Sequence, residues 1–160
     1  MLIGLASSGL HANGFSLVRQ ALLGRYALEE TPPGLTRPLG EELLEPCAIH
    51  APVVLRLARA GLLHAAAHIT GGGFTENVPR ALPPGLGARV DLGSWTVPPV
   101  FDLIAETSGA SDDDLYGTFN MGVGMVLVVA ADRAPEVLET AGPDAARIGE
   151  VVPGAGVLRA

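Results

Sequence analysis

The stretch HITGGGFTENVPR, residues 68–80, joins the end of an apolar run to a glycine-rich turn and a helix start. Residues 65–70 are small and apolar enough to predict a buried strand, and residues 74–82 predict a short helix interrupted by Pro79. The three glycines at 71–73 predict the turn between them. Because N–H groups at a helix start lack partners within the helix, and glycine lets a ligand approach the backbone, this stretch is typical of an anion-binding site.

Two further loops rich in glycine and small polar residues lie next to predicted strands. Residues 7–14 read SSGLHANG and follow the apolar run of residues 1–6, whereas residues 119–124 read FNMGVG and precede the apolar run of residues 125–131. Taken singly, each loop fits an ordinary turn as well as a ligand site, because Gly and Asn mark both. Three such loops, all with an Asn and two with a His, favour a ligand-binding cleft.

The remaining segments predict a fold that mixes helices and strands. Helices are expected at residues 15–24, 41–44, 52–60, 100–107, 112–118 and 134–141, and strands at residues 88–92 and 146–152. Ser111 is the expected N-cap of the helix that begins with three aspartates. Because helices and strands do not alternate strictly, the pattern predicts an α+β domain, a mixed β-sheet with helices packed on it.

The composition describes one acidic globular domain. The chain has 160 residues, of which 48% are hydrophobic and 17% charged, which argues against disorder. Its net charge is −7 and it has no Lys, so neither a nucleic-acid partner nor a catalytic lysine is expected. No apolar run is long enough to span a bilayer. A cytoplasmic location is expected because the single Cys47 cannot form an internal disulfide. A mean hydropathy of +0.37 fits a domain with one face covered by another domain or subunit.

Two histidines next to the glycine-rich loops, His11 and His68, are candidates for proton transfer or phosphate binding. A hydrogen-bonded structural role is the commoner one for a His of this kind. His50 and His64 carry no predicted role. Metal binding is not expected, because Cys47 is the only cysteine and the acidic run at residues 112–114 fits a helix start better than a cation site.

The predicted helix after the triple glycine carries two charged candidates. Glu76 suits a helix N-terminus by its charge alone, so its presence does not require a ligand. Arg80, one turn later, could pair with Glu76 or reach a phosphate.

Five motifs then occur in a recognisable order: GLASSGLHANGFSLVR at 4–19, LLEP at 43–46, HITGGGFTENVPR at 68–80, WTVPPVF at 95–101 and TFNMGVGMVLVV at 118–129. Through them the chain resembles the C-terminal domain of the phosphoribosylformylglycinamidine cyclo-ligase (aminoimidazole ribonucleotide synthetase) family. The resemblance implies the C-terminal domain fold of that superfamily over residues 1–152, with residues 153–160 as a tail that is either frayed or an edge strand.

The resemblance also implies a function in purine biosynthesis. The family uses ATP to activate formylglycinamidine ribonucleotide and closes its ring to aminoimidazole ribonucleotide. ATP and Mg²⁺ are held mainly by an N-terminal domain, which also forms a homodimer. This chain is expected to lack that domain, to have no cofactor of its own and to be inactive alone. The alternatives are the C-terminal domain of a related selenophosphate, thiamine-phosphate, hydrogenase-maturation or amidotransferase enzyme, or a non-catalytic binding module.

The residues that match the family motifs are the expected lining of the cleft. They are Ser7, Ser8, Gly9, His11, Asn13 and Gly14 from the first motif, and His68, Thr70, Gly71, Gly72, Gly73, Glu76, Asn77 and Arg80 from the second. By this resemblance, the backbone N–H groups of the glycine turns would bind a phosphate of the substrate or nucleotide. Either His68 or His11 would move a proton during ring closure, and the sequence does not decide between them.

Overall fold

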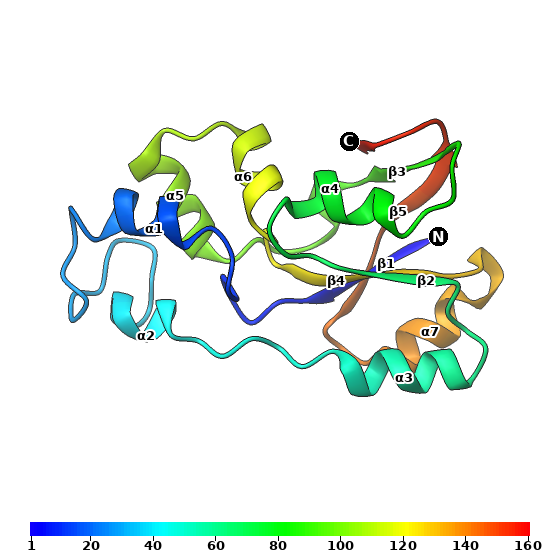
Figure 1. Ribbon diagram of the computed structural model, residues 1–160. Helices are drawn as coiled ribbons and strands as arrows, with labels where there is room; N and C mark the ends of the chain where they lie inside the picture. Colours follow the sequence, from blue (N-terminus) through cyan, green and yellow to red (C-terminus); the bar gives the residue numbers. More distant parts are fainter.

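A computed structural model of the chain describes residues 1–160 (Figure 1). The strands are β1 Leu2–Ala6, β2 Ala65–His68, β3 Leu86–Val90, β4 Val123–Val128, β5 Ala145–Pro153 and β6 Val157–Arg159. The α-helices are α1 Phe15–Leu22, α2 Leu39–Leu43, α3 Ala51–Arg59, α4 Gly73–Arg80, α5 Pro99–Ser108, α6 Asp112–Thr118 and α7 Ala134–Ala141. Two short 3₁₀ turns, η1 Leu92–Ser94 and η2 Ala131–Arg133, complete the set. No helix combines the length and the apolar character needed to cross a membrane.

All six strands form one sheet in the order β2-β4-β1-β5-β3-β6. The central strand pairs are antiparallel, whereas β6 runs parallel to β3 at one edge. The sheet is therefore mixed, and the predicted α+β class is confirmed. The final residues, 157–159, form the edge strand β6.

The sheet buries side chains on both faces, because successive residues of a strand point to opposite sides. Leu2 and Val126 belong to the larger core, which includes residues from α1, α4, α5 and α6. Their neighbours Ile3 and Leu127 belong to a smaller core with residues of α3 and α7. In Figure 1, α3 and α7 accordingly lie below the sheet, and α4 lies above it.

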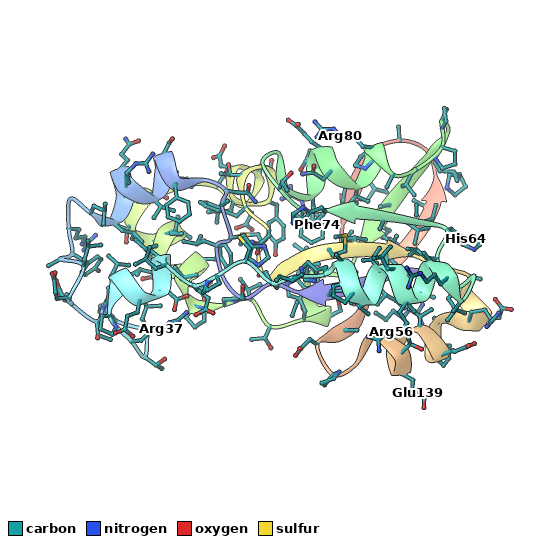
Figure 2. The ribbon with its side chains drawn as sticks, turned by 60° about the horizontal axis from the view of Figure 1, so that its bottom comes forward. Arg37, Arg56, His64, Phe74, Arg80 and Glu139 are labelled. Atoms are coloured by element: carbon teal, nitrogen blue, oxygen red, sulfur yellow. The ribbon has the colours of Figure 1, made fainter.

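The glycine turn leads directly into α4, and an aromatic cluster fixes that helix to the larger core. Phe74, in the first turn of α4, is fully buried and stacks on Trp95 with ring centres 5.7 Å apart. Figure 2 shows Phe74 on the inner side of α4 and Arg80 on its outer side. Burying an aromatic ring of this size contributes about 2–3 kcal/mol, which offsets the weak helix propensity of a segment that contains Pro79.

Helix α6 begins as predicted. The Ser111 hydroxyl accepts from the Asp114 N–H, and the Asp114 carboxylate accepts in turn from the Ser111 N–H, which makes a capping box. This cap fixes the start of the helix that ends just before Phe119 and Asn120, the residues that lead into β4.

Candidate functional site

The three glycine-rich loops of the sequence meet at one end of the sheet. Strand β4 lies between β1 and β2 and is antiparallel to both, so β1 and β2 run in the same direction. Ala6 at the end of β1 pairs with Val123, and His68 at the end of β2 pairs with Met125. The loops that leave β1 and β2 and the loop that enters β4 are therefore neighbours, as the cleft hypothesis requires.

The loop after β1 is fixed by Asn120, which is fully buried. The Asn120 amide donates to the carbonyls of Gly9 and Leu10 at 2.9 and 3.2 Å. Its side-chain oxygen accepts from the Ser7 hydroxyl at 2.8 Å and from the Gly122 N–H at 2.9 Å. Both polar atoms of this side chain form hydrogen bonds within the protein, so the role of Asn120 is to hold the loop in shape.

Ser8 and Asn13 tie the same loop to its neighbours. The Ser8 hydroxyl donates to the Pro46 carbonyl at 2.5 Å, and the Asn13 amide reaches the Ile69 carbonyl at 3.5 Å. The loop that leaves β1 is thereby joined both to the segment before α3 and to the end of β2.

The turn after β2 is fixed by Asn77, which is 7% exposed. Its amide donates to the carbonyls of Thr70 and Gly71, both at 3.2 Å, and of Gly73 at 2.8 Å. The Thr70 hydroxyl donates to the Asn77 side-chain oxygen at 3.4 Å. Asn77 therefore holds the turn from its inner side.

Glycine is required at position 73 on two grounds. Its φ of 53° lies in the left-handed region, and a Cβ there would stand 1.9 Å from the Tyr116 carbonyl oxygen. Gly71, in contrast, faces open space. The Gly73 and Glu76 N–H groups donate to backbone carbonyls, whereas those of Phe74 and Thr75 have no partner within the protein. These two free donors are consistent with the predicted anion site.

The charged side chains of α4 pair on its exposed side. Arg80 donates to the Glu76 carboxylate at 2.7 Å and to the Asn77 side-chain oxygen at 3.3 Å. The Glu76 carboxylate folds back over the turn, so that a Cβ on Gly72 would stand 2.6 Å from it. An anion at the turn would therefore meet a negative charge, and Arg80 would have to offset it.

His11 lies inside the loop after β1 and is 7% exposed. It adopts a φ of 57°, and its Nε2 accepts from the N–H groups of Ser8 and Ala48, both at 3.2 Å. Because Nε2 accepts two hydrogen bonds, the proton of the neutral ring must be on Nδ1. His11 thus bridges the loop after β1 and the segment before α3.

A third histidine, His50, connects the two predicted ones. It directly precedes α3, and its ring centre lies 6.2 Å from that of His11 and 6.5 Å from that of His68. We call His11, His50 and His68 the histidine row. His50 is 9% exposed and buried, whereas His68 is exposed.

Burial keeps the inner two members of the row neutral. It is the main cause that lowers the pKa of His11, and positive charge on His50 and His68 lowers it further. Burial likewise lowers the pKa of His50, with His68 as the second cause. The inner part of the site therefore disfavours added positive charge.

An open apolar pocket of about 570 Å³ adjoins the row. Its lining comprises Cys47, Ala48, Ile49, His50, Ala51, Val54, Leu55, His68 and Met125. Ile49 is 82% exposed and Leu55 is 53% exposed, and Leu44 nearby in the chain is 81% exposed. Large apolar side chains so exposed in one segment are typical of a surface that another protein part covers.

The structure thus divides the predicted site residues into two groups. Ser7, Ser8, Gly9, His11, Asn13 and Gly14 form the loop after β1, whereas His68, Thr70, Gly71, Gly72, Gly73, Glu76, Asn77 and Arg80 form the end of β2, the turn and α4. His11 and His68 come together through His50, while Glu76 and Arg80 pair with each other elsewhere. Sequence reasoning did not select His50 or Asn120. Only the position of Asn120 in a glycine-rich loop signalled its role.

Comparison with known proteins connects this architecture to one family. The family model described as AIR synthase related protein, C-terminal domain, matches residues 1–159. The phosphoribosylformylglycinamidine cyclo-ligase of Shouchella clausii is 52% identical over 99% of this chain, and that of Bacillus subtilis is 48% identical over 98% of it. In both cases the match covers 47% of the relative, so the chain spans about half the length of these curated relatives.

Solved structures agree on the fold. The hydrogenase maturation protein HypE of E. coli matches 98% of this chain and 46% of its own with a TM-score of 0.61 and 23% identity. The thiamine-monophosphate kinase of Stenotrophomonas maltophilia matches 99% of this chain and 49% of its own, also with a TM-score of 0.61, at 21% identity. At such low identity these neighbours support the fold alone. From the family model, which spans nearly every residue, we conclude that the chain belongs to the AIR synthase related family as its C-terminal domain.

Proposed function

We propose that this chain is the substrate-side half of a phosphoribosylformylglycinamidine cyclo-ligase, which closes the imidazole ring of aminoimidazole ribonucleotide in purine biosynthesis. The observation that carries the proposal is the 52% identity over 99% of the chain with a relative of that name. The structures of the hydrogenase maturation protein and the thiamine-monophosphate kinase are only 21–23% identical, which makes those functions weaker alternatives.

Within this proposal the chain supplies the wall of the cleft that binds formylglycinamidine ribonucleotide. The turn at residues 71–73 binds a phosphate of the substrate through the free N–H groups of Phe74 and Thr75, with Arg80 offsetting the charge of Glu76. The remaining candidates in the loop after β1, residues 7–14, face the same end of the sheet and position the rest of the substrate.

The histidine row supplies the proton acceptor for ring closure. Attack of the amidine nitrogen on the formyl carbon forms the C–N bond of the ring, and the bond from that carbon to the ATP-activated oxygen breaks, so that the oxygen leaves as phosphate. The nitrogen loses a proton in this step, which a neutral imidazole near the reacting atoms can accept. His68 suits this role because it is exposed, whereas the Nε2 lone pair of His11 is already occupied by two N–H donors. His11 then acts as a positioning residue, which narrows the two candidates that the sequence left open.

ATP and Mg²⁺ belong to the other half of the enzyme in this proposal, as does the homodimer contact. The apolar surface formed by Leu44, Ile49 and Leu55 suits the packing of that half, because these side chains are exposed in this chain. The relatives are roughly twice as long as this chain, so they contain enough residues for a second domain. A purine-biosynthetic enzyme of this kind would work in the cytoplasm.

Complementation of a purine auxotroph that lacks the cyclo-ligase tests the proposal. The chain alone should not restore growth, whereas the chain fused behind the N-terminal half of the Bacillus subtilis relative should. The same N-terminal half fused to its own C-terminal half is the matched control. Growth with the control but not with the chimera would count against the proposed activity, and growth with the chain alone would refute the need for a second half.

A further inference from the structure

The histidine row contains two buried nitrogen atoms that have no hydrogen-bond partner. They are Nδ1 of His11 and Nε2 of His50. Buried polar atoms are nearly always satisfied, so an unpaired pair at one place calls for a functional explanation. Both rings lie over Gly124 of β4, where a Cβ would stand 2.5 Å from His50 Nε2 and 2.8 Å from His11 Cε1. The absent side chain at position 124 is what lets both imidazoles pack against the sheet.

His11 cannot gain a proton without losing contacts. The second proton of the ring would have to go to Nε2, which accepts from the Ser8 and Ala48 N–H groups. A proton on Nε2 would point at the hydrogens of the Ser8 and Ala48 N–H groups, so both hydrogen bonds would be lost. The loop after β1 would then no longer be joined through His11 to the segment before α3. The inner end of the row is therefore held in its neutral form by geometry.

Protonation of His50 is disfavoured by its position between His11 and His68. Its Nε2 is enclosed by the sheet, and a charge there would lie close to any charge on His68. The elements around it offer no free counter-charge: Gly124 and Met125 come from β4, and Ala51, Val54 and Leu55 come from α3.

The segment before α3 contributes one titratable thiol, Cys47, and the carboxylate of Glu45, and α2 contributes the carboxylate of Glu42. Cys47 lines the same pocket as His50 and His68. Glu42 and Glu45 both bind Arg37, so their charge is offset there. Nothing near His50 therefore stabilises a positive charge on it.

We infer that His50 is a positioning residue that packs between His11 and His68, and that the two buried imidazoles, His11 and His50, are held in their neutral form. Of the three rings, only that of His68 is exposed, so it is the one that a substrate can reach. The use of His68 in ring closure rests on the proposed function, whereas the neutral form of His11 and His50 is a property of this chain and can be tested without activity.

Nitrogen NMR of the chain with ¹⁵N-labelled histidine measures each tautomer and each titration directly. At about pH 6.5, the ordinary pKa of histidine, His11 should carry a proton on Nδ1 alone and His50 should be neutral. A charged His11 or His50 at that pH would overturn the inference, as would a His11 tautomer with the proton on Nε2. This measurement needs no variant, so it stands even where a substitution prevents folding.

The variant His50→Gln separates a linked unit from three independent rings. At a pH low enough to charge His50 in the wild type, removing that charge should raise the titration midpoint of His11 by on the order of 0.5–2 pH units, as expected for charges about 6 Å apart at effective dielectric constants between about 80 and 20. His64→Gln is the matched control, since His64 lies outside the row, and it should leave His11 unchanged. An unchanged His11 midpoint in folded His50→Gln would overturn the coupling.

The NMR titration and the His50→Gln variant test the inference independently of the complementation experiment, which tests the proposed function. If the chimeric enzyme does not complement but His11 and His50 are neutral as expected, the positioning role of His50 stands without the proposed reaction. If the chimera complements but His11 or His50 is charged, the cyclo-ligase assignment stands and the positioning role of His50 is wrong.

Discussion

The two loops of the candidate site are fixed by the same device and yet present opposite chemistry. The loop after β1 is held by the buried amide of Asn120, and the turn after β2 by the buried amide of Asn77. Each Asn donates to carbonyls that the chain reversal leaves without partners. The first loop leads to the neutral, buried His11, whereas the second leads to the exposed ion pair of Glu76 and Arg80.

This difference suggests a division of work within one site. The side at β1 excludes charge and water, which suits control of a proton. The side at α4 exposes charge to solvent, which suits recognition of an ionic group such as a phosphate. Substitutions that disturb the loop after β1 and the turn after β2 should therefore have different consequences.

Gly73→Ala should cause the largest loss of stability. The new Cβ would meet the Tyr116 carbonyl oxygen at 1.9 Å, and neither backbone can easily move, because Gly73 is already held by Asn77. Positive-φ strain and overpacking together predict a loss of about 3–5 kcal/mol, measured by urea unfolding. Gly71→Ala, at a position that faces open space, is the control and should change stability by less than about 0.5 kcal/mol. Equal effects of both would contradict this account of the turn.

Asn120→Ala should cause the second largest loss of stability. It would leave the carbonyls of Gly9 and Leu10 and the Gly122 N–H without their partner in a fully buried place. The expected loss is about 2–3 kcal/mol. Asn77→Ala should cost less, about 1–2 kcal/mol, because the Gly71 side of its turn is open to water. A larger loss for Asn77→Ala would reverse the comparison between the two loops.

The local part of this architecture could be predicted from the sequence. The strand, turn and helix of residues 65–80 follow from a small apolar run, three glycines and an amphipathic segment, and the Ser111 cap follows from the aspartates behind it. The mixed sheet was also predictable, since strands and helices do not alternate. These features depend on interactions between residues close together in the chain.

The histidine row could not be predicted in the same way. His11, His50 and His68 come from three separate segments, and only the strand order β2-β4-β1 and the joining of residue 8 to residue 46 bring them together. Pairing of distant strands leaves no periodic pattern at the residues that it unites. For the same reason the sequence could mark His11 and His68 by their motifs but offered no reason to select His50.

Stability should fall as the pH drops through the histidine range. Burial lowers the pKa of His11 and His50 below their ordinary value of 6.5, so the unfolded chain binds more protons than the folded one at mildly acidic pH. The free energy of unfolding should then decrease from pH 7 toward pH 5.5, by at most about 1.4 kcal/mol per pH unit for each histidine. Thermal unfolding across this window measures the slope.

The variant His50→Gln should make that slope shallower, and His64→Gln should not. A slope of opposite sign would mean that the folded chain stabilises charged imidazoles. That result would contradict the neutral state assigned to the buried His11 and His50. An equal slope in wild type and His50→Gln would mean that other groups cause the acid effect.

Glu76→Gln should have the smallest effect on stability and a measurable one on binding. Its ion pair with Arg80 is exposed at both ends, 59% and 65%, so its loss should cost less than about 0.5 kcal/mol. The same substitution removes the negative charge beside Gly72, and inorganic phosphate should then bind about two- to fivefold more tightly, as expected for a charge near a helix N-terminus. Calorimetry at low salt, with Arg80→Gln as the variant that should weaken binding, makes the measurement. If Glu76→Gln weakened phosphate binding instead, the N–H groups at the start of α4 would not be the anion site.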